Sequence, residues 1–391
     1  MTVDNHKLHN CLLSVAFAVI YGTLSYTVSY KLALITPSDL FIHATAVQDV
    51  WIKEGFLPFF YKVSYPGWHL IVFILLKLGI PLISAGCLAS SFFSFLSALA
   101  VLYVSACILG KNHFYLAILI STITLFASSI FVPGFNPQPY YGQGSTTIWH
   151  NPTYTAVRPF AIASCAYLFF LFKYRRVNIK QCIIYALLTL ICLFLKPSFF
   201  QIQLPALYVY LVIDFIKNRD SKFCLYLLLS TLPALLYLAL QAQIMLFSPE
   251  NRGEGFTIGF FECWRAVSPN FVISCLLLTA FPIFLLVVLR KELNQNASPY
   301  SFLLLLTVIG FCEASFLAEA GPRMMHGNFF WGFYLALFLD WVFLLPRFIK
   351  VGIIEKRFSR WIIAIGCVLL LCHFISGINY YVYLLIGNVP F

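Results

Sequence analysis

Charged residues are scarce in this sequence of 391 residues. They make up 10% of the chain, whereas soluble proteins average roughly 25%. Hydrophobic residues make up 61%, and the mean hydropathy is +0.88. This composition excludes a soluble globular enzyme and predicts an integral membrane protein with several spans.

Several functional signatures are also missing. The sequence has no nucleotide-binding motif, and no predicted cytoplasmic loop could hold a nucleotide-binding domain, so direct use of ATP is not expected. The twelve cysteines lack CxxC or metal-ligand spacing and lie mostly in apolar runs, which is typical of small core residues. No internal repeat is visible, which disfavours a transporter built on repeats. No secretory cleavage pattern occurs, so the first apolar run is expected to be a retained helix.

Long apolar runs predict an all-α, polytopic fold with about eleven spans, since one span needs ~20 residues. Residues 66–80 are apolar but short and interrupted by Lys77, so we expect a juxtamembrane or re-entrant helix there, within a first outer loop at 36–81. The predicted spans cover about residues 11–35, 82–109, 114–133, 155–172, 181–196, 198–216, 223–247, 269–289, 300–318, 328–346 and 361–385.

The basic residues predict the orientation. The formal net charge is +11, which membrane topology explains without nucleic acid. With the N-terminus inside, sixteen of the 25 Lys and Arg residues lie inside, including the clusters KYRR, KNRDSK and EKRFSR. Seven acids and four histidines then lie outside, so the chemistry is expected on the outer face. Abundant Phe and short loops favour a bacterial cytoplasmic membrane.

The first outer loop begins with the stretch SDLFIHATAVQDV. Residues 39–54 predict an amphipathic helix on the membrane surface, with Asp39, His43 and Asp49 on one polar face. Asp39 and His43 are one turn apart and can reach the same ligand. The alternatives are an ordinary solvated pair and, for Asp39 after Ser38, a helix cap.

A second outer loop, 134–159, is rich in Pro, Gly, Asn and aromatic residues, and ends in His150 and Arg158. A long loop of this kind is often a binding loop or lid. Aromatic residues beside polar groups suit a sugar ring, although a structured turn with interfacial aromatics is the alternative. Arg158 is expected at a span entrance, where a charge is expensive and tends to be functional.

Two further outer segments carry cations. Lys196, followed by Pro197, is expected to present a fixed charge near the lipid headgroups, unless it only snorkels. The last outer loop contains Glu319, Arg323 and His326. Arg323 is a candidate for phosphate binding because a guanidinium binds phosphate through two hydrogen bonds; a Glu–Arg pair within the loop is the alternative.

Three stretches in order carry a family resemblance: SDLFIHATAVQDVWIKEG, then YPGWHLIVFILLKLG before a long span, then LFLKPSFFQIQLPAL. This succession resembles the polytopic glycosyltransferases of the GT-C superfamily, such as protein O-mannosyltransferases and aminoarabinose transferases. In that family an acid in the first outer loop, a juxtamembrane helix with proline and a lysine–proline turn recur in this order. The resemblance covers about residues 11–215. It implies a GT-C-like module at 1–215 followed by variable transmembrane helices at 216–391.

The resemblance implies transfer of a sugar from a polyprenyl-phosphate donor on the outer face, with inversion. Asp39 takes the place of the family's general base, and Lys196 matches the lysine near the donor phosphate. The sequence departs from the family in having Ser-Asp where an Asp-Glu pair is frequent, and in His69 within YPGWH. The acceptor is expected to be an envelope glycan or a lipid-linked molecule.

The residue inventory fits this chemistry, which needs a base for the acceptor hydroxyl and cations for the leaving phosphate. His43 is a second catalytic candidate, no cofactor is specified, and a divalent ion is left open as a cofactor. Two alternatives are a polysaccharide polymerase or ligase that uses a polyprenyl-diphosphate donor, and a lipid-linked oligosaccharide flippase or transporter. The oligomeric state is open.

Arg158 and Arg323 join Lys196 as donor-phosphate candidates. The acceptor or sugar candidates are His69, Trp149, His150, Asn151, Glu319 and His326.

Overall fold

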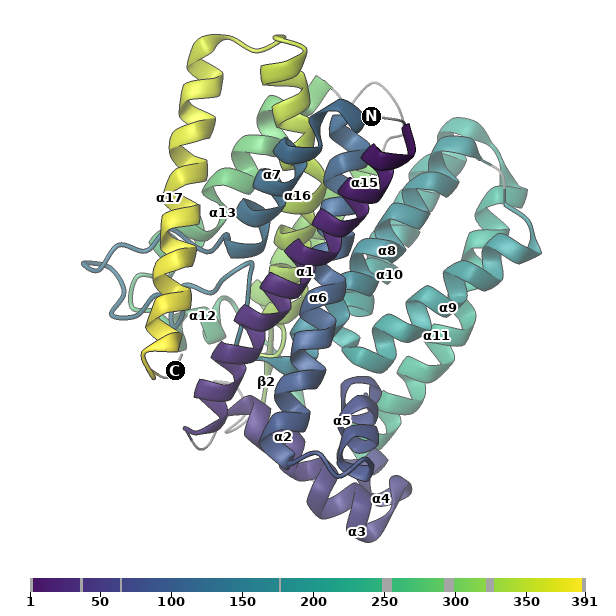
Figure 1. The fold of residues 1–391 in the computed structure, drawn as a ribbon. Helices are drawn as coiled ribbons and strands as arrows, with labels where there is room; N and C mark the ends of the chain where they lie inside the picture. The colour runs from purple at the N-terminus through teal and green to yellow at the C-terminus, as the bar shows by residue number, and fades with distance from the viewer. Residues whose placement is uncertain are drawn as a thin grey trace.

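The computed structural model describes residues 3–35, 38–63, 65–175, 177–247, 255–291, 299–320 and 327–388. Nearly all regular structure in these ranges is helical (Figure 1). The exception is a two-stranded antiparallel sheet in which β1 (Phe256–Ile258) pairs with β2 (Leu317–Glu319). The prediction of an all-α protein is therefore confirmed for the described part of the chain.

Each predicted span corresponds to a helix. Eight described helices are long and apolar enough to cross a membrane, so the protein is an integral, multi-pass membrane protein. The predicted number of eleven stays a prediction, because α7 and α9 have only 13 and 17 residues, and α16 is buried in protein except at Arg347. The helices are α1 (Val3–Ala33), α6 (Leu82–Leu109), α7 (Phe114–Phe126), α8 (Pro152–Tyr174), α9 (Ile179–Leu195), α10 (Pro197–Asn218), α11 (Ser221–Phe247), α13 (Phe271–Val288), α15 (Pro299–Phe316), α16 (Phe330–Ile349) and α17 (Arg360–Leu385).

Small residues let α1 and α6 pack closely. A Cβ on Gly22 would lie 3.2 Å from the Ser91 carbonyl oxygen of α6. The Ser91 hydroxyl donates to the Gly22 carbonyl at 2.8 Å, and one turn along, Ser94 Oγ donates to Ser25 Oγ at 2.7 Å. Small residues and hydroxyl hydrogen bonds are the usual means of helix association in a membrane, where lipid supplies no hydrophobic drive.

The helix predicted at 114–133 ends early, at Phe126. Residues 127–151 follow as irregular chain, and 142–150 are buried. Irregular backbone at membrane depth is tolerated only where protein satisfies its polar groups. Neighbouring helices do this here: Ile130 N–H donates to the Leu277 carbonyl of α13, and Phe131 N–H donates to Ser376 Oγ of α17.

Two tight contacts place this segment within the bundle. Gly377 of α17 lies so close to the Phe126 carbonyl that a Cβ there would overlap it. His373 Nδ1 lies 2.5 Å from the Ser128 carbonyl, and its other ring nitrogen accepts from Phe281 N–H at 3.3 Å. The end of the predicted span 114–133 is therefore irregular chain packed within the bundle, and residues 142–150 of the predicted outer loop are buried as well.

Short helices form one end of the molecule. They are α2 (Asp39–Ala46), a π-helical turn (Val47–Trp51), α3 (Ile52–Glu54), α4 (Phe56–Lys62) and α5 (Gly67–Lys77). Figure 1 shows them together at its lower end, below α6. The α5 helix has 11 residues and is about 16 Å long at 1.5 Å per residue. It is too short to cross a bilayer, as predicted for residues 66–80.

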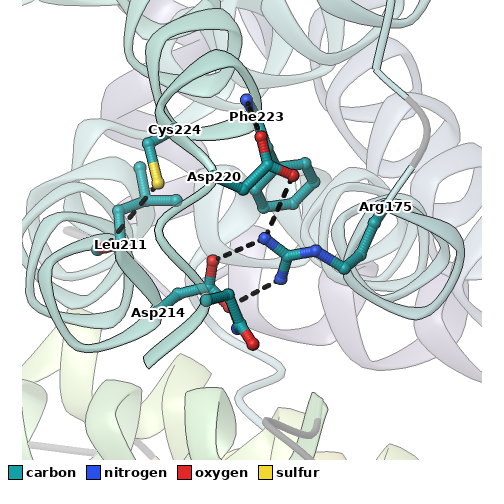
Figure 2. Close-up of polar contacts among 7 residues, drawn as sticks. Arg175, Leu211, Asp214, Asp220, Phe223 and Cys224 are labelled. Atoms are coloured by element: carbon teal, nitrogen blue, oxygen red, sulfur yellow. Dashed lines mark hydrogen bonds and ion pairs between the residues drawn. The ribbon is translucent and has the colours of Figure 1, made fainter. Parts of the chain in front are cut away.

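The opposite end is tied by an ion-pair cluster (Figure 2). Arg175, in the left-handed conformation after α8, donates to both carboxylate oxygens of Asp214 at 2.8 and 3.1 Å. It also reaches Asp220 at 3.3 Å and lies over the ring of Phe223. Asp220 in turn accepts from Phe223 N–H at the start of α11. The cluster joins the α8–α9 connection to the α10–α11 connection.

The two predicted parts of the chain, 1–215 and 216–391, pack against each other. Residue 215 falls inside α10, and α16 contacts α6, α8 and α10. On α16, a Cβ at Gly332 would lie 3.0 Å from the Ser198 carbonyl oxygen of α10. One hydrophobic core includes residues from both parts. The ends of α8, α9, α10 and α16 that face the short helices form the site described next.

Candidate functional site

Asp39 is the first residue of α2, and its side chain is half-buried. The preceding residue, Ser38, caps the helix by accepting a hydrogen bond from Phe41 N–H at 3.3 Å. The alternative interpretation of Asp39 as the helix cap is therefore wrong. Its carboxylate instead accepts a hydrogen bond from Asn151 Nδ2 at 3.0 Å, across 112 residues of sequence.

Asn151 holds a carboxylate and an ammonium on opposite ends of one amide. Its Nδ2 donates to Asp39, while its Oδ1 accepts from Lys196 Nζ at 3.4 Å. The same oxygen accepts from Tyr154 N–H at 2.8 Å, which makes Asn151 the N-cap of α8. Thr153 Oγ1 donates to this oxygen and accepts from Lys196 Nζ at 3.1 Å. The cap thus fixes the amide, and the amide fixes the charged pair.

Lys196 lies between α9 and α10 and is 5% exposed. Its ammonium is 4.7 Å from the ring centroid of Trp331, the second residue of α16. Burial lowers the pKa of Lys196 to about 8, and the nearby Asp39 carboxylate opposes this shift. Pro197 begins α10 and Pro152 begins α8, so two helix N-termini, which favour anions, start beside the ammonium.

His43 and His69 form a direct pair. His43 Nδ1, on α2, lies 2.9 Å from His69 Nε2, on α5. Burial lowers the pKa of His43 to about 4, with Asp39 raising it and Lys196 lowering it. His69 is fully buried, and burial places its pKa well below the ordinary value. Both rings are therefore neutral at pH 7.

His150 contacts Tyr380 of α17, with 2.9 Å between His150 Nδ1 and the Tyr380 hydroxyl oxygen. Tyr140 packs edge-on to His150 and stacks on Tyr380. Burial lowers the pKa of His150 to about 4, while Asp39 raises it and Lys196 lowers it. His150 is thus near both members of the charged pair, and it is 6% exposed.

Glu319, in β2, is linked to the site through Asn328. Asn328 Nδ2 donates to Glu319 Oε2 at 2.7 Å, and Asn328 Oδ1 accepts from Trp331 Nε1 at 3.1 Å. Because Lys196 lies over the Trp331 ring, these contacts connect the last outer loop to the ammonium. The predicted Glu319–Arg323 pair lies outside the described residues, as do the candidates Arg323 and His326 themselves.

Arg158 is not at a span entrance, as predicted, but inside α8. The helix begins at Pro152, so the loop predicted to reach residue 159 ends at Asn151. Arg158 is therefore two turns further along and fully buried. It contacts the Tyr21 hydroxyl at 3.5 Å and the Phe338 ring, and its Nε and Nη2 have no hydrogen-bond partner among the residues that the structure describes.

Trp149 packs into the core, with ring contacts to Tyr21, Phe126 and Tyr381. It is 5% exposed. Asp49, predicted on the same polar face as Asp39, is exposed and pairs with Lys53 at 2.7 Å. The prediction assumed a regular α-helix, in which residues recur on one face at a constant spacing. The π-helical turn between α2 and α3 breaks this spacing, so Asp49 does not share a face with Asp39.

No group of three or more His, Cys, Asp or Glu side chains that could hold a metal ion occurs among the residues the structure describes. The facing nitrogens of His43 and His69 are in hydrogen-bond contact with each other, so neither is directed at a common ligand. The divalent ion that the sequence left open stays untested, and no step below is assigned to one.

Sequence reasoning missed four residues of this cluster. Thr153 lies two residues beyond the predicted Asn151, and its hydroxyl at the first turn after a proline was an available signal. Trp331 lay in a stretch already singled out for its polar residues. Tyr140 and Tyr380 had no such signal, because tyrosines are frequent throughout the chain, which contains 22 of them.

The fold and site define a multi-pass membrane protein with a buried polar cluster where several helix ends meet. A scan against protein-family models and a search of curated proteins found no match to the chain.

Proposed function

We propose that this protein is a membrane glycosyltransferase of GT-C type that transfers a sugar from a polyprenyl-phosphate donor. The observation that supports it best is the Asn151 amide, which holds the Asp39 carboxylate and the Lys196 ammonium on its two ends. A transfer with inversion needs a base and a cation at fixed separation. The fixed amide provides this arrangement before any substrate binds.

The mechanism follows from these two groups. The Asp39 carboxylate accepts the proton of the acceptor hydroxyl as its oxygen attacks C1 of the sugar. The bond from C1 to the phosphate oxygen breaks, and the electron pair leaves with the polyprenyl phosphate. The Lys196 ammonium and the first turns of α8 and α10 stabilise that charge. The acceptor is an envelope glycan or a lipid-linked molecule.

The second candidate function is transport of a lipid-linked oligosaccharide. It is favoured by Arg158 and Asp340, which are both fully buried within helices. Charges at membrane depth mark substrate paths in many transporters. The transferase is preferred because the Asp39–Asn151–Lys196 group brings a base and a cation together at one end of the bundle. Cleavage of the donor, which only the transferase performs, distinguishes the two.

The proposal places the cluster on the extracytoplasmic side, because basic residues gather at the other end. We expect a cysteine at Phe135, which is 40% exposed, to react with an impermeant maleimide added outside. A cysteine at Lys180, at the start of α9, should react only after permeabilisation. Both are made in a background without native cysteines. Labelling of both from one side would contradict the orientation.

A further inference from the structure

The buried Lys196 ammonium is held by groups that carry no charge. Its Nζ donates to Asn151 Oδ1 at 3.4 Å and to Thr153 Oγ1 at 3.1 Å, and lies 4.7 Å from the centroid of the Trp331 ring. Among the described residues, no carboxylate lies within ion-pair distance of this nitrogen. A buried lysine ordinarily needs a charged partner, and here three neutral groups take its place.

The acids that the structure describes on neighbouring elements form no ion pair with Lys196. Asp39 of α2 is held at the other end of the amide that contacts the ammonium. The Glu313 carboxyl group of α15 lies beside the third residue of α16. Three histidine rings also lie near these groups: His43 on α2, His69 on α5 and His150 before α8. Burial lowers the pKa of each ring, so all three are neutral at pH 7.

The packing of α16 on α10 places Trp331 beside the ammonium. Lys196 directly precedes α10, and Trp331 is the second residue of α16. A Cβ on Gly332 would lie 2.7 Å from Ile202 Cγ2 and 3.0 Å from the Ser198 carbonyl oxygen, both in α10. A larger residue there would have to displace these atoms. The starts of the two helices are therefore in direct contact.

The edge of the indole is fixed by the last outer loop. Trp331 Nε1 donates to Asn328 Oδ1 at 3.1 Å, and Asn328 Nδ2 donates to Glu319 Oε2 at 2.7 Å. The ring is buried and packs against the rings of Tyr154 and Tyr334. These contacts hold the indole in one orientation, with its face towards the ammonium.

An aromatic face stabilises a cation without cancelling its charge. The ring quadrupole attracts an ammonium within about 6 Å of the centroid, and the attraction is larger where water is excluded. A carboxylate in the position of the ring would also keep Lys196 protonated. However, it would offset the positive charge that an incoming anion needs.

We infer that Trp331 is a positioning residue whose indole face keeps the Lys196 ammonium charged and in place without neutralising it. The ammonium is thereby left to attract an anion that a substrate brings. That this anion is the phosphate of the donor rests on the proposed function. The contact and the charge of Lys196 in the ligand-free protein do not.

The contact is tested first by NMR on ligand-free, full-length protein in nanodiscs, labelled with ¹³C-lysine. The Lys196 side-chain signal is the one that is missing from Lys196→Met. Protons above an aromatic ring are shifted upfield, so we expect the Lys196 Hε protons upfield of those of the exposed lysines. A Lys196 signal at the ordinary lysine position would overturn the inference, whether or not the protein transfers sugar.

Two substitutions of Trp331 then test the charge. Trp331→Phe and Trp331→Leu both remove the indole N–H, but only phenylalanine keeps an aromatic face. The Lys196 signal should titrate about 1 pH unit lower in Trp331→Leu than in wild type, with Trp331→Phe between the two. Trp341→Phe is the matched control, because Trp341 is a fully buried tryptophan further along α16. It should leave the Lys196 titration unchanged.

The direction of the change separates this role from a packing defect. A cavity that admits water would raise the pKa of Lys196 towards its ordinary value, whereas loss of the ring lowers it. A Trp331→Leu midpoint equal to or above that of wild type would therefore overturn the inference. If Trp331→Leu does not fold, the upfield signal in wild type and a lowered midpoint in Trp331→Phe are still required.

Transfer in proteoliposomes links this charge to the reaction. Single-turnover release of polyprenyl phosphate is measured across the pH range for wild type and both Trp331 variants. Its alkaline decline should move to lower pH in the same order as the NMR midpoints. Absence of transfer by a wild-type protein with the expected NMR signals would count against the proposed function alone.

Discussion

The Asp39→Asn variant is expected to fold normally and to lose sugar transfer by at least about 100-fold, within the range of general base catalysis. An amide has the shape of the carboxylate but cannot take up the acceptor proton. Its oxygen can still accept from Asn151 Nδ2, as Asp39 does at 3.0 Å. Ser38 caps α2, so the helix does not depend on this carboxylate. The measurement is transfer by purified protein in proteoliposomes.

Asp49→Asn is the matched control. Asp49 lies on the π-helical turn that directly follows α2, and pairs with Lys53 on the protein surface. An exposed ion pair of this kind contributes about 0–1 kcal/mol. We expect wild-type transfer and unfolding temperature for this variant. Equal activity of Asp39→Asn and Asp49→Asn would remove Asp39 from the mechanism.

The Lys196→Met variant is expected to lower kcat by about 100- to 1,000-fold, the usual loss when one stabilising group for a developing charge is removed. Methionine has a similar length and no charge. Lys196 is 5% exposed, so its replacement relieves the desolvation of an ammonium and should not lower the unfolding temperature. The measurement is single-turnover release of polyprenyl phosphate. Unchanged release would contradict the role of the ammonium.

The pKa of Lys196 adds a pH dependence to this prediction. Burial lowers it to about 8, whereas an unfolded lysine has a pKa of about 10.4. Transfer should therefore fall as the pH rises through about 8, because the ammonium becomes neutral. Between these two values the unfolded chain binds more protons, so this group makes the folded state more stable as the pH rises. Loss of activity above pH 8 with retained stability would match the account.

Lys196→Arg provides the check on that assignment. A guanidinium stays charged at all accessible pH values. The variant's residual transfer should not decline between pH 8 and 10, even if its maximum is lower than that of the wild type. A decline identical to the wild type would place the titrating group elsewhere.

The sequence predicted a large part of the site because its residues lie at helix ends. Asp39, Asn151 and Lys196 each flank an apolar run, and runs of this length can be located from hydropathy alone. The structure brings these three together. Their contacts could not be predicted, since Asp39 and Asn151 are separated by 112 residues in sequence. Their catalytic roles stay predictions.

Arg158 was predicted at a span entrance because the start of α8 was placed too late, although the sequence contains a signal for the correct start. The start of α8 was set by hydropathy, which begins to rise near residue 155. Asn151 followed by Pro152 is a stronger signal, because Asn caps helices and Pro is favoured at the first helical position. Starting the helix at Pro152 puts Arg158 two turns inside, where the structure has it fully buried.

The early end of α7 had only a weak local signal. Residues 127–133 contain Ser128, Ser129 and Pro133, but the apolar residues around them let hydropathy extend the helix through the segment. Their backbone is instead satisfied by distant groups, such as Leu277 and Ser376. Tertiary partners of this kind override the local pattern, and only the packed bundle reveals them. The π-helical turn after Ala46 is a similar case. A π-helical turn contains about one residue more than an α-helical turn, and residue composition does not reveal it.

Cleavage of the donor is the central claim, and proteoliposomes loaded with a radiolabelled polyprenyl-phosphate hexose test it most directly. Release of polyprenyl phosphate and movement of the intact donor between leaflets are measured in the same vesicles, for wild-type protein and Asp39→Asn. We predict that wild-type protein forms polyprenyl phosphate and that Asp39→Asn does not. Movement of intact donor across the bilayer without cleavage, at the same rate in both proteins, would contradict the account and identify a transporter.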